Sequence, residues 1–217
     1  MKTIHSRRAF SIFNFQFSIP FLILIALLTA CHRAPKQHYN VLLITLDTFR
    51  ADRLGAATPN LSKLASDGVR FANAESPVPL TMPAHASLLS GELPVRHGVR
   101  NNGVAAFPAD KETLATVLAR GGYRTGAFVS AFVLDHRFGL NRGFDTYDDA
   151  IVRDPNAASS FDAERRGGDT VDRALAWLRN SGDGRPFFAW VHLYDPHTPY
   201  DPPPAFLERA HGHAYDG

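Results

Sequence analysis

YNVLLITLD, residues 39–47, is the stretch that decides the fold class of this chain. The run is rich in leucine and β-branched residues, and it ends on Asp47. A continuous apolar run of this length is typical of a strand buried on both faces, as the strands of parallel sheets are. We therefore expect a buried strand with a carboxylate at its carboxyl end.

A second run of the same kind, FFAWVHLY, occupies residues 187–194, and helical and extended segments alternate between the two runs. This alternation predicts an α/β fold with a mostly parallel central sheet sandwiched by helices. Functional sites of such sheets form at the carboxyl ends of the strands. Further strands are expected over residues 69–74 and 123–129, and helices over residues 59–67, 81–90, 112–120 and 171–178.

The first thirty residues have the pattern of an export signal rather than of a folded segment. Basic residues precede an uncharged stretch over residues 9–30, whose apolar part is too short to span a bilayer, which needs about 20 apolar residues. Residues 28–31, LTAC, resemble the lipobox of bacterial lipoproteins. That resemblance implies lipidation of Cys31, a tether over residues 31–38, and an exported, membrane-anchored protein that faces the periplasm or the cell exterior. The alternative is an N-terminal anchor helix with an incidental cysteine.

Composition sets few further limits. The 217 residues carry a net charge of +2, with 45% hydrophobic and 20% charged residues, which is an ordinary globular balance for one domain. The basic residues are scattered, which argues against a nucleic-acid partner. The chain stops at HAYDG with no closing element, so we expect residues 39–217 to be the N-terminal part of a larger catalytic domain.

Three segments place reactive side chains where chemistry is expected. Asp47 ends the first strand, Thr81 opens a helix whose N-terminus favours an anion, and His192, Asp195 and His197 follow one another within six residues. Taken singly, each has an ordinary structural explanation: the aspartate can cap a turn, the threonine can cap its helix, and a lone histidine is usually structural. Their combination carries the functional interpretation.

Together, these segments resemble the sulfatase/alkaline-phosphatase superfamily over nearly all of residues 39–204. In that family an aspartate ends the first strand and binds metal, and Asp47 matches it. The family's nucleophile opens a helix two residues before a proline and ten before a glycine, a spacing matched by Thr81, Pro83 and Gly91. The resemblance implies an alkaline-phosphatase-like fold, Thr81 as the nucleophile, and a divalent metal bound by Asp47 and Thr81.

Two further matches concern substrate binding. The superfamily's nucleotide pyrophosphatase/phosphodiesterases carry T-x-P-x-H followed by an asparagine, and His85 and Asn102 fall in that register. Sulfatases place a histidine in a D-P-H-x-P segment, and His197 matches it. The resemblance thus implies that His85, Asn102 and His197 contact the bound ester, with Asn102 hydrogen-bonded to a non-bridging oxygen.

The chain departs from sulfatases that use formylglycine. Those enzymes form the aldehyde from Cys or Ser, whereas Thr81 cannot yield it, and the only cysteine lies in the predicted signal. The family's lysine-containing G-K-W-H segment is missing, and its Asp-Asp pair appears as Asp47-Thr48. The loss of one hard oxygen ligand favours zinc or manganese over calcium.

The sequence therefore predicts a metal-dependent hydrolase of sulfate or phosphate/phosphonate esters, sulfatase-like but without formylglycine. The substrate class is a small-molecule or a glycan or lipid ester. Two alternatives stay open: a transferase that moves a phosphoryl head group at the cell surface, and a truncated non-catalytic binding protein.

Overall fold

The structure is a computed structural model that describes residues 38–152, 163–180 and 183–206. The predicted signal peptide, Cys31 and all of the predicted tether except His38 lie outside these residues. Within the described part of the chain, no helix has the length and apolar character needed to cross a membrane.

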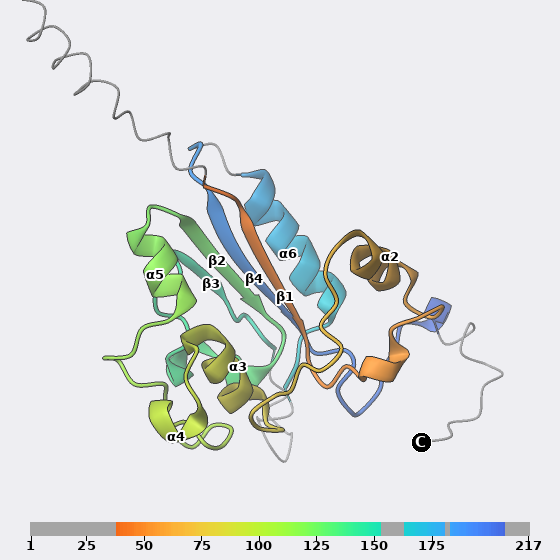
Figure 1. Ribbon diagram of the computed structural model, residues 1–217, viewed down its shortest axis with the longest axis horizontal. Helices are drawn as coiled ribbons and strands as arrows, with labels where there is room; N and C mark the ends of the chain where they lie inside the picture. The colour runs from red at the N-terminus through yellow and green to blue at the C-terminus, as the bar shows by residue number, and fades with distance from the viewer. Residues whose placement is uncertain (1–37, 153–162, 181–182, 207–217) are drawn as a thin grey trace, which may run out of the picture. The chain divides into compact units, whose positions relative to one another are not determined.

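Four strands form a single parallel sheet in the order β1-β4-β2-β3, which confirms the predicted fold class (Figure 1). Strands β1 and β4 pair along their whole length, from Val41 opposite Phe188 to Leu46 opposite Leu193. The two apolar runs that indicated the fold are thus neighbours in the sheet. The strands are β1 (Val41–Leu46), β2 (Arg124–Val129), β3 (Thr146–Asp148) and β4 (Phe187–Leu193).

Helices lie on both faces of the sheet, as the sequence predicts (Figure 1). Helix α6 contacts β2 and β4 on one face, and α3 and α5 lie on the other. The helices are α2 (Pro59–Asp67), α3 (Thr81–Ser90), α4 (Pro94–His97), α5 (Leu114–Arg120) and α6 (Gly167–Arg179), with short 3-10 turns η1 (Ala51–Arg53), η2 (Phe132–Leu134) and η3 (His136–Phe138).

Alternation along β4 divides the core into two clusters. Phe188 and Trp190 pack with the apolar side chains of α3 and α5, whereas Val191 packs on the other face with Ala174 and Trp177 of α6. Successive strand residues point to opposite faces. A strand buried in this way needs apolar residues at nearly every position, and β4 is apolar throughout except at His192.

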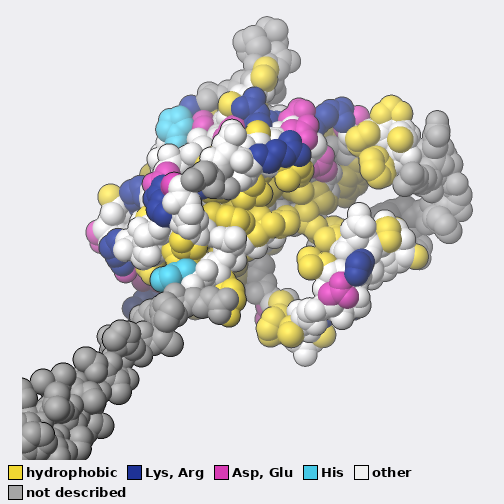
Figure 2. All heavy atoms as spheres, turned by 90° about the horizontal axis from the view of Figure 1, so that it is seen from above, with side chains coloured by type: hydrophobic (Ala, Val, Ile, Leu, Met, Phe, Trp, Pro, Cys, Tyr) yellow, Lys and Arg dark blue, Asp and Glu magenta, His cyan; other side chains and the backbone are white. Residues whose placement is uncertain are grey.

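The edge strand β1 is covered less completely. Leu42 and Ile44 remain 50% and 51% exposed, and Figure 2 shows that apolar side chains reach the surface on the face it views. Val41 and Leu43, on the opposite face of the strand, pack against the larger cluster. Among the described residues, β1 is therefore buried mainly on the face that α3 and α5 cover.

The expected strand over residues 69–74 is wrong. The segment is irregular, with Val69 and Phe71 80% and 78% exposed. A strand needs a neighbour to pair its backbone groups and a core to bury its side chains, and the described residues supply neither here.

Strand β3 was not predicted, because three residues give too short a pattern. Helix α5 begins at Leu114, two residues later than predicted, and α6 begins at Gly167, four residues earlier than predicted.

Gly143 provides a test of how α5 is seated. Its φ is +87°, and a Cβ there would lie 2.6 Å from the carbonyl carbon of Ala115 in α5. Gly122 has a similar φ of +85° but open space around it. Because left-handed strain alone costs about 1–2 kcal/mol, we expect Gly122→Ala to destabilise by about that amount. Gly143→Ala adds a clash with backbone and should cost about 3 kcal/mol or more.

Thermal unfolding of the two variants beside the wild type measures this difference. Equal thermal unfolding midpoints for Gly143→Ala and Gly122→Ala would show that α5 can move away from the added methyl group at no cost in stability.

Candidate active site at the carboxyl ends of the strands

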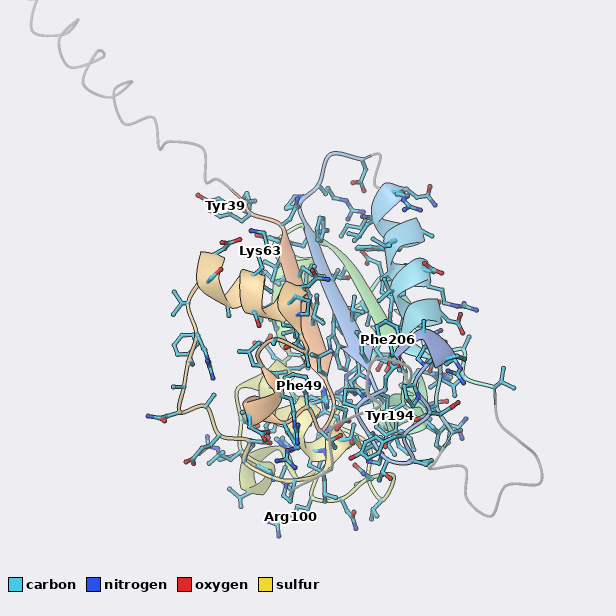
Figure 3. The ribbon with its side chains drawn as sticks, turned by 90° about the vertical axis from the view of Figure 1, so that its right-hand side faces the viewer. Tyr39, Phe49, Lys63, Arg100, Tyr194 and Phe206 are labelled. Carbon is cyan, nitrogen blue, oxygen red and sulfur yellow. The ribbon has the colours of Figure 1, made fainter. Side chains whose placement is uncertain are left out.

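The side chains of Asp47 and His192 meet at the carboxyl ends of the neighbouring strands β1 and β4. Thr45 of β1 pairs with His192 of β4, and Asp47 follows directly after β1. The backbone N–H of Asp47 donates to the carbonyl of Leu193 at 2.9 Å, which extends the pairing by one step. In Figure 3, Tyr39 lies at the end of the sheet where β1 begins, and Phe49 and Tyr194 lie at the opposite end. Asp47 and His192 thus lie together at the carboxyl ends of the strands.

Asp47 is held as a carboxylate by its neighbours. Its Oδ2 lies 3.4 Å from Nε2 of His192, and the hydroxyl of Thr81 donates to the same carboxylate. Burial opposes ionisation, but these hydrogen bonds outweigh it and keep the pKa of Asp47 below its usual value. The site therefore contains a fixed negative charge beside a threonine hydroxyl.

Thr81 is the first residue of α3, one place beyond the cap position that its sequence suggests, and it is 7% exposed. The cap residue is Leu80, and α3 ends at Gly91 in the left-handed conformation (φ 69°) that glycine adopts readily. The start of a helix normally offers free N–H groups, but Pro83 has none and that of Met82 is already used. Within the described residues the N–H of Thr81 has no hydrogen-bond partner, so it is a backbone donor that the first turn leaves available.

Asn102 lies at the start of α3. Its side-chain Oδ1 accepts the N–H of Met82 at 2.9 Å, which brings the amide to the start of α3 beside Thr81. Because an N–H donor fixes this atom as the oxygen, Nδ2 must be the other atom. Within the described residues Nδ2 has no hydrogen-bond partner, so it is available to donate to an ester oxygen.

His85 lies one turn after Thr81 on the same face of α3. Its Nδ1 is 2.7 Å from the carbonyl of Thr81, and its ring meets the ring of His192 edge-on, with centroids 4.8 Å apart. Burial, together with the nearby His192, lowers the pKa of His85 to about 4. His85 is therefore a neutral imidazole at physiological pH.

His192 is fully buried on the face of β4 that carries Trp190. Burial lowers its pKa, although the hydrogen bond to Asp47 and that residue's charge act in the opposite direction. The sequence grouped His192 with Asp195 and His197 and did not single it out as a partner of Asp47. Its even spacing from Trp190 was a usable signal for the face on which it lies, but the position of α3 on that face was not readable.

Asp47, His85 and His192 together could hold a metal ion, since one ligand atom from each lies within 4.8 Å of the others. A second such group, Asp135 with His136 and Asp149, lies among η2, η3 and the end of β3. There His136 is 62% exposed and its ring is already hydrogen-bonded to Asp149. Thr81 and Asn102 lie beside the first group.

Asp195 and His197 lie apart from this group. The carboxylate of Asp195 accepts the N–H of Gly167 at 3.1 Å and so caps the start of α6. The ring of His197 stacks on Tyr194, with centroids 4.2 Å apart, and its Nδ1 lies 2.6 Å from the carbonyl of Thr198. The ring centroids of Tyr194 and His192 are 6.0 Å apart, so the ring of Tyr194 lies between the two histidines.

Thr48, which stands where the family's second aspartate is expected, has a structural task. It has a φ of 51°, a conformation that residues other than glycine rarely adopt. Its hydroxyl donates to the carbonyl of Pro196 at 3.0 Å, which ties the end of β1 to the loop that carries His197. Strain of this kind is often found at functional sites.

Comparison with known proteins agrees with this geometry. The family model described as Sulfatase matches residues 39–216. The chain belongs to the sulfatase family. Rat (Rattus norvegicus) arylsulfatase G is 37% identical over 128 residues, which are 53% of this chain and 24% of that protein. The chain thus spans about a quarter of the length of this curated relative.

Two solved structures share the fold. A structure in complex with its substrate D-glucosamine-2-N,6-O-disulfate has a TM-score of 0.64 at 21% identity, over 78% of this chain and 37% of that one. The phosphonate monoester hydrolase of Agrobacterium radiobacter has a TM-score of 0.59 at 24% identity, over 78% and 43%. The sulfatase/alkaline-phosphatase superfamily assignment made from the motifs is therefore confirmed. Homologues in this family are hydrolases, and members of the superfamily depend on metal.

Acidification tests whether His85 is buried and neutral. The pKa of a histidine is ordinarily 6.5, and that of His85 in the fold is about 4, so unfolding takes up a proton between these values. Stability is then complete above pH 6.5 and is lost as the pH falls towards 4. From pH 6.5 to pH 5 the loss is about 2 kcal/mol, at 1.36 kcal/mol for each pH unit.

We expect the urea midpoint of the metal-stripped protein to fall on going from pH 7 to pH 5. The fall should be smaller in His85→Phe, which keeps a ring but does not titrate. An identical fall in the two proteins would contradict a neutral, buried His85.

Proposed function

We propose that this protein is a metal-dependent hydrolase of sulfate, phosphate or phosphonate esters, with Thr81 itself as the nucleophile and no formylglycine. The observation that carries the proposal is the hydroxyl of Thr81 beside the carboxylate of Asp47, at the start of a helix and at the carboxyl end of the sheet. Thr81 would attack the ester with its own hydroxyl oxygen, because a threonine side chain cannot be converted to the formylglycine aldehyde.

In this reaction the Thr81 oxygen forms a bond to sulfur or phosphorus while the bond to the ester oxygen breaks. The leaving alkoxide takes a proton and departs as the alcohol, and water then hydrolyses the ester formed on Thr81. Nδ2 of Asn102 and the N–H of Thr81 donate to the non-bridging oxygens, where negative charge gathers. His197 would contact the same group from the loop after β4.

A divalent metal bound at Asp47 and Thr81 would lower the pKa of the threonine hydroxyl and neutralise charge on the transferred group. The residues present fit such an ion, because Asp47 is ionised and the neighbouring histidines are neutral. Imidazole neighbours and the loss of the second aspartate at Thr48 favour zinc or manganese over calcium.

The substrate class is a small-molecule, glycan or lipid ester. The support comes from the relatives: an arylsulfatase, a protein solved with a disulfated glucosamine, and a phosphonate monoester hydrolase. Transfer of a phosphoryl head group to an acceptor at the cell surface uses the same first step with an alcohol in place of water. We disfavour a non-catalytic binding role, because Thr81, Asp47 and Asn102 lie close together.

Replacing Thr81 tests the nucleophile in the intact protein as its own cells make it. Thr81→Ala should reduce turnover of an aryl phosphodiester, an aryl sulfate and a phenylphosphonate monoester to background, a loss of about a thousandfold or more. Thr81→Ser should keep part of the activity. An acid-quenched reaction of the wild type should show a phosphate or sulfate adduct on Thr81 by mass spectrometry.

Ser90→Ala serves as the matched control, since it removes a hydroxyl from the opposite end of the same helix, where it donates to Ala86. Unchanged turnover in Thr81→Ala would end the nucleophile assignment.

We also propose that the protein is an exported lipoprotein anchored at Cys31. The support is the sequence alone, a short uncharged apolar stretch followed by LTAC. A doubly or triply acylated cysteine would hold the protein at the membrane, because each buried methylene contributes about 0.8 kcal/mol.

Growth with labelled palmitate tests the anchor. The wild type should carry label and sediment with membranes, whereas Cys31→Ser should do neither. An unlabelled wild-type band of mature size would remove the lipoprotein proposal.

A further inference from the structure

Two neutral histidines lie against Asp47, and their hydrogen bonds give them opposite tautomers. This difference decides which of them can bind a cation. A ring nitrogen can act as a metal ligand only if it carries no proton. The location of the proton on each ring follows from the groups that face the other nitrogen.

In His85 the proton is on Nδ1. This atom lies 2.7 Å from the backbone carbonyl of Thr81, which can only accept a hydrogen bond. Nε2 therefore has a lone pair, and no hydrogen-bond partner for it exists within the described residues. A histidine that donates Nδ1–H to a carbonyl and leaves Nε2 unprotonated has the arrangement of metal-binding histidines.

In His192 the proton is on Nε2. Its Nδ1 faces the backbone N–H of Ser130 at 3.4 Å, a group that can only donate. Nε2–H then points to Oδ2 of Asp47, also at 3.4 Å. His192 thus supports the carboxylate as a donor and has no lone pair on that side.

The two rings are fixed in these orientations by packing. His192 is fully buried and His85 is 8% exposed, and both rings pack against Trp190, with centroid distances of 6.3 and 5.6 Å. The indole N–H of Trp190 donates to Thr45 at 3.1 Å, so the ring that supports both histidines is itself held in place.

We propose that His85 is a metal ligand through Nε2, beside Asp47, and that His192 is a positioning residue that orients Asp47 without touching the metal. The proposal rests on the proposed function, since it concerns the metal of that same site. An imidazole nitrogen next to a carboxylate selects zinc over calcium, which binds oxygen. In this proposal His85 binds the metal. The motif alone instead suggests that His85 contacts the substrate.

The test measures zinc binding directly, by titration of the metal-stripped intact protein against a competing chromophoric chelator. His85→Phe keeps the ring volume and removes the ligand, so zinc affinity should fall about a hundredfold, while calcium affinity stays unchanged. The rise of the unfolding temperature with zinc should disappear in the same variant.

His192 is tested by a pair of variants. His192→Gln keeps a donor near the position of Nε2 and should bind zinc within about threefold of the wild type. His192→Phe removes the donor and should weaken zinc binding about tenfold, as the loss of a group behind a ligand does. His136→Gln is the control, because it disrupts the other metal-capable group of the described residues and should leave zinc binding unchanged.

Wild-type zinc affinity in His85→Phe would overturn the ligand assignment, and so would a wild type that binds no zinc. A loss in His192→Gln as large as in His85→Phe would overturn the positioning role.

Ester turnover separates these outcomes from failure of the proposed function. If zinc binding depends on His85 but the wild type hydrolyses no sulfate, phosphate or phosphonate ester, the ligand assignment stands and the hydrolase proposal fails. If turnover depends on Thr81 while His85→Phe binds zinc normally, the hydrolase proposal stands and the ligand assignment fails.

Discussion

The candidate site depends on the parallel pairing of β1 with β4. The contact between Asp47 and His192 joins residues 145 positions apart, and it forms because both stand at the carboxyl end of adjacent strands. Buried charge is costly unless it is paired and hydrogen-bonded. The strand pairing supplies the hydrogen-bond donor that allows Asp47 to remain ionised beneath the start of α3.

Helix α3 adds the second half of the site. Its first turn carries Thr81, and one turn later His85 lies on the same face, because residues four apart are neighbours on a helix. That face packs against Trp190 and His192 of β4, so the sheet sets the position and orientation of Thr81. Side chains that would each have an ordinary structural role thus become one group.

The departures from formylglycine sulfatases form a consistent set when seen on the structure. A threonine at the nucleophile position replaces the family's convertible cysteine or serine. Thr48, in place of a second aspartate, holds the loop that carries His197 by a hydrogen bond to Pro196. The candidate site therefore has fewer carboxylates and more neutral imidazole than the family's calcium sites, which is the reason for proposing zinc rather than calcium.

The sequence by itself determined the fold class and the family, and it predicted Asp47, Thr81, His85 and Asn102 as site residues. Buried parallel strands and the nucleophile motif are local patterns, so they can be read without tertiary contacts. The role of Asp195 as the cap of α6, the irregular course of residues 69–74 and the partnership of His192 with Asp47 were decided only by the tertiary structure. Each depends on which segments become neighbours in space. The proton on a histidine ring depends on the same thing, because it is set by backbone groups from elsewhere in the chain.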